Sequence, residues 1–442
     1  MNLIEVLDEE IASDGQNWEA LLKLSKVYTD IDKLGHAYAF AIAALQTQPT
    51  ADAFVQLGII CDARGQHKEA LSLYESAHQI DDKDISVMNR AGQACLSLGL
   101  VDDAENWFLL PQKKLSDEEF AAANTNDLDA NMAFIYLARQ NYRNGWKLWN
   151  LGEGKGGRVA RYRHLPKWQP GQKGAVVFWG EQGLGDQIFF SECLHDALAD
   201  CEGDAIIEVD PRLVGLFSRS FPQAIVVGSL YQDDTTSVQA TAQCSIAALP
   251  ALYRHNANSY RKMPYLKSCD DRDAMAAGLL NRMGKKRKIG ISWTGGLAHN
   301  GGADRSRELS ELMSAFKKID ADWISLEHTV EGYPENDGVT VYPFLTERAL
   351  DYDYTASLVS QLDLVVSVPN SIVHTAGALG TPTIVLGANA PSWCKTVMNI
   401  PAYRNQTVLY NWTPQSAAKR IKETLNAFIK LRRVENRNRG NA

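Results

Sequence analysis

The sequence predicts an α + α/β chain, in which an array of helical repeats is followed by two α/β domains. Its first third repeats itself at a spacing of 33 and then 34 residues. After it, short apolar segments alternate with segments of helical periodicity, an order typical of parallel sheets. At 442 residues the chain is also too long for one ordinary hydrophobic core. Two or three domains are therefore expected.

The repeats share residues of similar size at equivalent positions. The aligned positions are Ser25, Tyr28, Ala37, Ala41 and Ala44 in the first copy, Gly58, Cys61, Ala70, Tyr74 and Ala77 in the second, and Gly92, Cys95, Ala104 and Phe108 in the third. Two antiparallel helices approach closely only where a small residue stands, and large residues fill the space between them. The pattern resembles the tetratricopeptide repeat (TPR), whose arrays form a concave surface for peptides or partner proteins. A helical packing domain without a partner is the alternative.

A fourth, looser copy is marked by Ala133, Tyr136, Gly145 and Trp149. No clear solvating cap comes after it, so we expect this copy to dock on the next part of the chain. The repeats are therefore placed at residues 1–151. Residues 152–174 are rich in glycine and basic residues and contain two prolines, which predicts a linker.

Two series of predicted strands come after the linker. They lie at 175–180, 205–210 and 224–228, and then at 288–293, 323–327, 363–368 and 382–387. Helices are predicted at 186–199, 211–219, 308–318, 355–362, 371–379 and 415–431. We expect two Rossmann-like domains, 175–284 and 285–442, that face each other across a cleft. Ligands of such sheets bind beyond the carboxyl ends of the strands.

The composition excludes several functional classes. The chain is 45% hydrophobic and 22% charged, with a net charge of −8, which is typical of a globular protein and argues against one that coats nucleic acid. No apolar run predicts a transmembrane helix, and the acidic N-terminus lacks an apolar signal segment. The seven cysteines are scattered, without a Cys-x-x-Cys pair. They fit the reduced thiols of a cytoplasmic protein.

The segment FWGEQGLGDQIFF, residues 178–190, joins the first predicted strand to a helix. Backbone amides at such a helix start attract anions, and Gly183 and Gly185 let the chain approach a ligand closely. Asp186 is expected at or near the N-cap, where it either caps the helix or faces the ligand. A dinucleotide motif would need a third glycine at Ile188, so a nicotinamide-dependent oxidoreductase is disfavoured.

Several motifs, in order, resemble a glycosyltransferase family 9 module, the ADP-heptose:lipopolysaccharide heptosyltransferase-like family, joined to TPR repeats. The motifs are NGWKLW, LPKWQPGQKGAVVFWGEQGLGDQIFF, ALP and MPYL in the first half, and GISWTGGLAHNGGADRSREL and DYDYTASLVSQLDLVVSVPNSIVHTAGALGTPTIVLG in the second. The resemblance runs, with gaps, from about residue 140 to residue 425. It implies a GT-B module of two Rossmann-like domains with a closing C-terminal helix. The nucleotide-sugar donor would sit mainly on the second domain and the acceptor on the first.

The resemblance also implies an inverting transfer without a metal or other cofactor, and no His, Asp or Glu cluster has metal-ligand spacing. Asp186 matches the family's general base, and Glu181 is the alternative base in the same loop. The expected donor-binding residues are Trp293, Arg305, Ser306, Asn370, Ser371 and His374. Three of them have a plainer alternative, because Arg305 could be a surface arginine, and His374 and Trp293 could serve only in packing.

Two departures from the family pattern separate the functional hypotheses. Pro369 stands where the family commonly has aspartate, and Gly296 alters the loop after Trp293. The leading hypothesis is a cytoplasmic glycosyltransferase whose repeats select an acceptor, which we expect to be a protein. The alternative is a non-catalytic TPR/GT-B scaffold. Retention of Asp186 and His374, together with Arg305 and Ser371, favours the enzyme.

Overall fold

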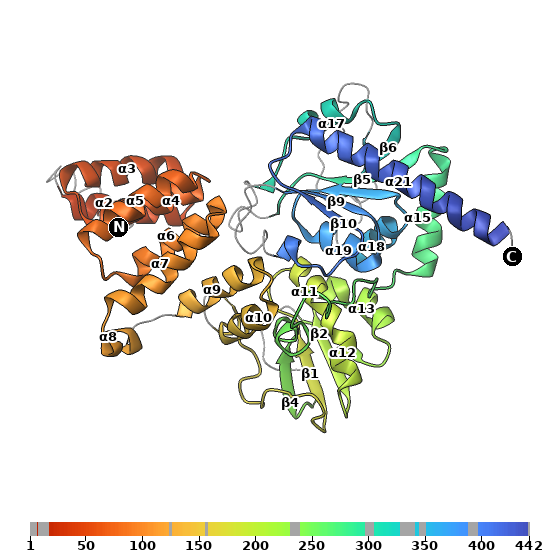
Figure 1. The fold of residues 1–442 in the computed structure, drawn as a ribbon, viewed down its shortest axis with the longest axis horizontal. Helices are drawn as coiled ribbons and strands as arrows, with labels where there is room; N and C mark the ends of the chain where they lie inside the picture. The colour runs from red at the N-terminus through yellow and green to blue at the C-terminus, as the bar shows by residue number, and fades with distance from the viewer. Residues whose placement is uncertain are drawn as a thin grey trace. The chain divides into compact units, whose positions relative to one another are not determined.

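The computed structural model describes residues 7, 17–122, 126–154, 158–229, 239–296, 305–327, 341–343, 351–387 and 397–440 (Figure 1). The described chain divides into two compact units between Arg139 and Gln140, before the boundary predicted at residue 151. We call them the repeat unit and the α/β unit.

The repeat unit is a series of helix pairs. Its helices are α2 (Trp18–Asp30), α3 (Leu34–Thr47), α4 (Ala51–Ala63), α5 (His67–Ile80), α6 (Ile85–Leu98), α7 (Val101–Lys114), α8 (Asp117–Ala122) and α9 (Asn126–Ala138). The first helix of each of the first three pairs starts at a capping side chain: Asn17, Thr50 and Asp84 accept bonds from amides of the first turn. These caps recur at the repeat spacing, so the chain marks the beginning of each copy locally.

The small residues of the repeat lie where helices meet. A Cβ on Gly58 would lie 2.5 Å from the ring of Tyr74, and one on Gly92 would strike the ring of Phe108. In the first copy Ser25 takes the glycine position, and its hydroxyl donates to the carbonyl of Ala37 at 2.8 Å. The interdigitation of small and large residues predicted from the repeat is confirmed.

The fourth copy is divided between the two units. Helix α9 belongs to the repeat unit, whereas α10 (Tyr142–Leu151) packs in the α/β unit. There the indole of Trp146 donates to the hydroxyl of Tyr260 at 2.8 Å, and the indole of Trp149 donates to the carbonyl of Ala247 at 3.1 Å. Of the last copy, α10 therefore docks on the next part of the chain as expected, whereas α9 stays with the other repeats.

The described part of the predicted linker packs on the first sheet. Arg158 and Arg161 are buried, and each pairs with a buried carboxylate, Glu181 and Glu208 respectively. Trp168 is also buried, and its amide bonds the carbonyl of Gln243 at 2.8 Å. Basic residues that suggest a solvated linker are here counterions of the first α/β half.

That first half is built on a parallel sheet of order β3-β2-β1-β4. Its elements are β1 (Val176–Trp179), α11 (Leu184–Phe190), α12 (Leu194–Ala199), β2 (Ala205–Val209), α13 (Val214–Ser220), β3 (Ile225–Gly228), β4 (Ala242–Ser245) and α14 (Pro250–Tyr253). Strands β1 and β2 are buried throughout, as expected when helices cover both faces.

The second half has a parallel sheet of order β10-β9-β8-β5-β6-β7. Its elements are α15 (Asp270–Arg282), β5 (Arg287–Ser292), α17 (Leu309–Phe316), β6 (Ala321–Ser325), β7 (Val341–Pro343), α18 (Tyr352–Ser360), β8 (Leu364–Ser367), α19 (Ser371–Leu379), β9 (Thr383–Leu386), β10 (Gln406–Leu409) and α21 (Pro414–Gly440). Alternate residues of β8 enter two cores, one shared with α17 and α21 and the other with α15, α18 and α19. The expected C-terminal helix thus covers one face of the second sheet.

The predicted class is confirmed: helical repeats are followed by two Rossmann-like α/β halves, the arrangement of a GT-B module.

Candidate functional site

The loop after β1 leads directly into helix α11. Gly183 is the N-cap residue in an extended conformation, and Asp186 is the third residue of the helix. The Asp186 carboxylate reaches back and accepts the amide hydrogen of Gly183, at 3.1 Å between Oδ2 and the nitrogen. Asp186 is half-buried. It therefore lies one turn inside the position of a simple N-cap, while it still satisfies a donor at the helix start.

Glu181 occupies a different environment in the same loop. It is 1% exposed, and the guanidinium of Arg158 binds both of its oxygens, with Nε 3.1 Å from Oε2. The hydroxyl of Ser245 donates to the same carboxylate. Arg158 also lies over the ring of Trp149, 4.1 Å from its centroid. Glu181 thus joins the predicted linker and α10 to the first sheet, which argues against its role as the alternative base.

Gly185 is one of the points where the two α/β halves touch. A Cβ there would lie 3.1 Å from Cα of Ser371 and 3.1 Å from Cδ2 of His374. Helix α11 of the first half therefore packs against the beginning of α19 of the second half. The glycine is needed for this contact as well as for any approach to a ligand. Through it, the predicted base and the predicted phosphate helix are brought together.

His374 is held in its neutral form. It is 6% exposed, and burial lowers the pKa of its imidazole to about 3. Its Nδ1 lies 2.9 Å from the hydroxyl of Tyr403, whose own pKa is raised above its usual value, chiefly by burial. Either group can donate in this bond, because a neutral imidazole carries its hydrogen on Nδ1 or on Nε2 and a phenol both donates and accepts. The ring of Phe189, from α11, meets the imidazole edge-on at 5.6 Å between centroids.

Asn370 connects the start of α19 to the loop after β5. Its Oδ1 caps the helix by accepting the amide hydrogen of Ile372 at 3.0 Å. Its Nδ2 donates to the hydroxyl of Ser292 at 2.7 Å and to the carbonyl of Thr294 at 3.0 Å. One amide side chain thus fixes the ends of β5 and β8 relative to each other.

Glu327 organises the same loop, although it was not among the predicted site residues. It is 7% exposed and comes after β6. One oxygen accepts hydrogen bonds from the amides of Trp293 and Thr294, at 2.7 and 2.9 Å, and from the hydroxyl of Ser292 at 2.8 Å. The hydroxyl of Thr294 bonds the other oxygen. The predicted strand 323–327 ran through this residue, which concealed the signal of a carboxylate directly after a buried strand.

The remaining predicted donor-binding residues lie on this edge of the second sheet. Arg305 is 8% exposed and its Nη1 lies 3.4 Å from the carbonyl oxygen of Pro369, which excludes the surface-arginine alternative. The hydroxyl of Ser306 accepts the amide hydrogen of Gly295 at 2.9 Å. Trp293 packs partly against the core of the second sheet. Residues 297–304 of this motif lie outside the described residues.

Known proteins resemble parts or most of the chain. Residues 63–126 match the family model described as tetratricopeptide repeat. Protein FlbA of Caulobacter vibrioides is 25% identical over 278 residues, which cover 53% of this chain and 41% of that protein. The chain thus matches about two fifths of that relative's length.

Solved structures that are similar to the chain at low identity include two transferases. The ADP-heptose lipopolysaccharide heptosyltransferase II of E. coli is 12% identical, covers 58% of this chain and 99% of its own, and has a TM-score of 0.43. An O-GlcNAc transferase of Thermobaculum terrenum is 12% identical and covers 94% of each chain, with a TM-score of 0.36. The fold assignment itself rests on the repeats and on the two parallel sheets.

Two negative findings on the described residues complete the site. No helix among them is both long and apolar enough to cross a membrane. Within the same ranges, no three His, Cys, Asp or Glu side chains gather in a way that could hold a metal ion.

Proposed function

We propose that the protein is an inverting glycosyltransferase that takes a nucleotide-sugar donor on its second α/β half and an acceptor chosen by its repeats. The observation that carries the proposal is the meeting of the Gly183–Asp186 loop with Ser371 and His374. Strands β1, β5 and β8 end at loops that contribute to this region. In parallel sheets such edges are where ligands bind. The family 9 motifs of the sequence fall on the same loops.

The donor diphosphate is assigned to the beginning of α19. The amide dipoles of that helix favour an anion at Ser371, and the guanidinium of Arg305, held near Pro369, supplies a cation. His374 contributes as a neutral hydrogen-bonding group rather than as a charge, because its pKa is about 3. Asn370 and Glu327 shape the loop around this position without contributing a positive charge.

Asp186 is assigned as the general base. It would accept the proton of the acceptor nucleophile as that atom forms its bond to the anomeric carbon. The bond from the anomeric carbon to the diphosphate breaks in the same step, and the nucleoside diphosphate leaves with the electron pair. Attack from the face opposite the leaving group inverts the configuration. The half-buried position of Asp186, on the α11 side of the contact with α19, supports this role.

The acceptor is assigned to the repeat unit, and we infer that it is a protein segment. A hollow of about 480 Å³ is lined by residues of α2, α4 and α6, and a neighbouring one of about 610 Å³ continues along α6. Both include Ser86 and Arg90. These are the first helices of successive pairs, the side of a TPR array that forms its concave surface. A continuous groove of this kind suits an extended or helical peptide.

Calorimetry with UDP, GDP, ADP and CMP, and with the corresponding nucleotide sugars, tests the proposal. One nucleoside diphosphate should bind. Arg305→Ala should weaken this binding, while the unliganded variant still shows a measurable melting transition. A ligand at 100 times its dissociation constant should raise the unfolding free energy by about 2.7 kcal/mol. Absence of binding by all of them, in protein shown to be folded, would favour the non-catalytic scaffold.

The six described cysteines are free thiols, which fits the proposed cytoplasmic location.

A further inference from the structure

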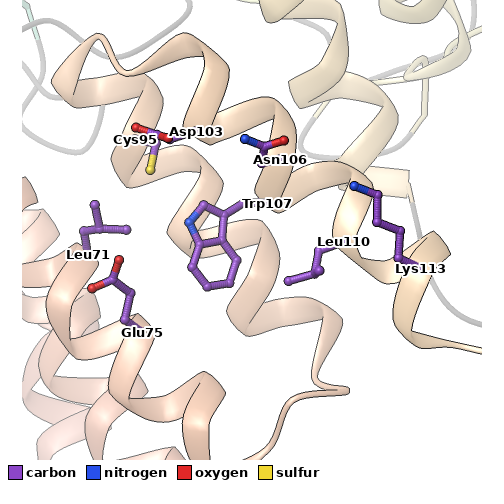
Figure 2. A pocket seen from close by; sticks show the side chains of 8 residues that line it. All are labelled: Leu71, Glu75, Cys95, Asp103, Asn106, Trp107, Leu110 and Lys113. Carbon is purple, nitrogen blue, oxygen red and sulfur yellow. The ribbon is translucent and has the colours of Figure 1, made fainter.

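The repeat unit has another pocket, on different helices from the groove described above. Its volume is about 450 Å³, within the range of roughly 300–1,000 Å³ typical of ligand pockets. It is lined by Leu71, Glu75, Cys95, Asp103, Asn106, Trp107, Leu110 and Lys113. These residues come from α5, α6 and α7. Figure 2 shows the indole of Trp107 in the middle, with Leu71 and Glu75 on one side and Leu110 and Lys113 on the other.

The apolar lining is partly exposed, although Leu71 and Trp107 also pack against the core of the repeats and Trp107 meets His78 edge-on, with 5.1 Å between ring centroids. The packing positions of this copy are filled by Ala104 and Phe108, which are buried. Trp107 and Leu110 are only partly buried, and at the repeat spacing their counterparts in the preceding copy are Leu73 and Ser76. The third copy therefore exposes a large aromatic and a leucine where the second has smaller groups. Such exposed apolar surface, rimmed by charge, marks a place for a partner.

The charges around Trp107 select the partner. Glu75 and Asp103 are exposed, and neither forms an ion pair with a described residue. The adjacent acids of α7 behave differently, because Asp102 and Glu105 both bind Arg139. The fields of Glu75 and Asp103 also meet at the floor of the pocket, where they add to burial in raising the pKa of the Cys95 thiol to about 12.

We propose that this pocket binds a lysine or arginine side chain of a partner protein, presented next to an aliphatic residue. The stem of the basic side chain would lie on Trp107 and Leu71, with its charge over the indole and close to the two carboxylates. The aliphatic neighbour would contact Leu110. Lys113, at the far end, would repel a second basic residue and attract an acidic one. This docking site is separate from the acceptor groove and does not depend on the proposed transferase activity.

Fluorescence anisotropy with the full-length protein and short labelled peptides tests whether the pocket binds a basic side chain. The peptides are matched pairs, in which a Leu-Arg-Leu or Leu-Lys-Leu centre is exchanged for Leu-Glu-Leu. Wild-type protein should prefer the basic member by roughly tenfold. Glu75→Gln combined with Asp103→Asn keeps the shape of the pocket and should remove the preference. Trp107→Leu should weaken the basic peptides without creating affinity for the acidic ones.

The negative net charge of the protein attracts basic peptides at any site, so a second double variant controls for this general attraction. Glu19→Gln combined with Glu118→Gln makes the same change of charge on the repeat unit, at exposed residues that do not line the pocket. This variant should keep the wild-type preference. Either an equal loss in both double variants, or a preference that survives neutralisation of Glu75 and Asp103, would overturn the proposal. So would a wild-type protein that binds both members of each pair equally.

Discussion

The hydroxyl of Tyr403 lies 2.9 Å from Nδ1 of His374. Phe189 of the first α/β half packs against the same imidazole, which belongs to the second half. Because the phenol keeps its proton and the imidazole is buried, His374 is a fixed neutral hydrogen-bonding group. It cannot serve as a phosphate-binding cation near neutral pH. Among the described residues, we assign the positive charge of the proposed donor site to Arg305 and to the dipole of α19.

His374 should make stability depend on pH in a defined window. In the unfolded chain a histidine titrates near pH 6.5, whereas in the folded protein the pKa of His374 is about 3. Between these pH values the histidine is protonated in the unfolded state but not in the folded state. Lowering the pH from 6.5 towards 3 therefore favours the unfolded state and reduces folding stability. Above pH 6.5 the contribution is fully present. Urea unfolding of His374→Gln should show a smaller loss of stability over this window than wild type. His164→Gln, which changes an exposed side chain, should keep the wild-type slope, and an unchanged slope in His374→Gln would contradict the prediction.

Gly185→Ala should separate α11 from α19. The new methyl group would meet the backbone of Ser371 at 3.1 Å, and backbone atoms cannot move aside as a flexible side chain can. We expect a loss of about 1–3 kcal/mol in stability, the usual cost of overpacking, together with weaker binding of the donor nucleotide. Gly278→Ala is the control, because nothing lies within 4 Å of its added methyl on α15. It should stabilise the protein by roughly 0.5–1 kcal/mol. Normal stability and nucleotide binding in Gly185→Ala would show that the contact is not needed.

Elements with strong local signals were predictable from the sequence. Helix α19 has the predicted bounds, 371–379, because Asn370 caps its start and Gly380 ends it in a left-handed conformation. Strands β4 and β10 were missed for opposite reasons. The AQCS segment of β4 is buried but too polar to be recognised as a strand, and β10 is only half-buried at the edge of its sheet.

The site was predictable only where its residues lie in recognisable loops. Those loops do converge, but the sequence could not identify the partners that tertiary structure brings from elsewhere. Glu181 looked like a candidate base because its ion pair with Arg158 is formed by a segment that resembled a linker. Glu327 was overlooked because the four hydrogen bonds of its carboxylate all run to the end of another strand and the loop after it.

Glu181→Gln should act on stability rather than specifically on chemistry. Removing one charge of a buried ion pair leaves the other uncompensated, at a cost of about 3–5 kcal/mol. The exposed pair of Lys83 and Glu119 provides the comparison, since Glu119→Gln should change stability far less. Thermal melting distinguishes the two. If Glu181→Gln instead melted normally and lost its turnover, Glu181 would be the base.

The division of the fourth repeat determines where the repeats can be removed. A chain beginning at Gln140 keeps α10, with Trp146 and Trp149 bonded into the first α/β half. This chain should fold, bind the nucleotide-sugar donor and slowly hydrolyse its sugar–phosphate bond, but it should fail to modify the natural acceptor. A chain beginning at Gly152 loses both tryptophans and should be poorly folded. Circular dichroism and calorimetry on the two truncations test this. Full transfer to the natural acceptor by the Gln140 chain would mean that the repeats have another role.

Asp186 offers the most direct separation of a structural from a catalytic role. Its Oδ2 accepts the amide hydrogen of Gly183, and an asparagine at this position can accept the same bond through its amide oxygen. Asp186→Asn should therefore fold and bind the donor nearly as wild type does. An amide cannot take the proton of the acceptor, so turnover should fall by roughly 10²- to 10⁴-fold. Asp186→Ala loses the bond as well and should in addition be destabilised by about 1 kcal/mol, as for the loss of a helix cap. If Asp186 only completes the start of α11, the pattern reverses: Asp186→Asn keeps its turnover, and Asp186→Ala loses stability without a comparable loss of rate. Melting temperature and single-turnover rate, measured on the same preparations of both variants, distinguish the two roles.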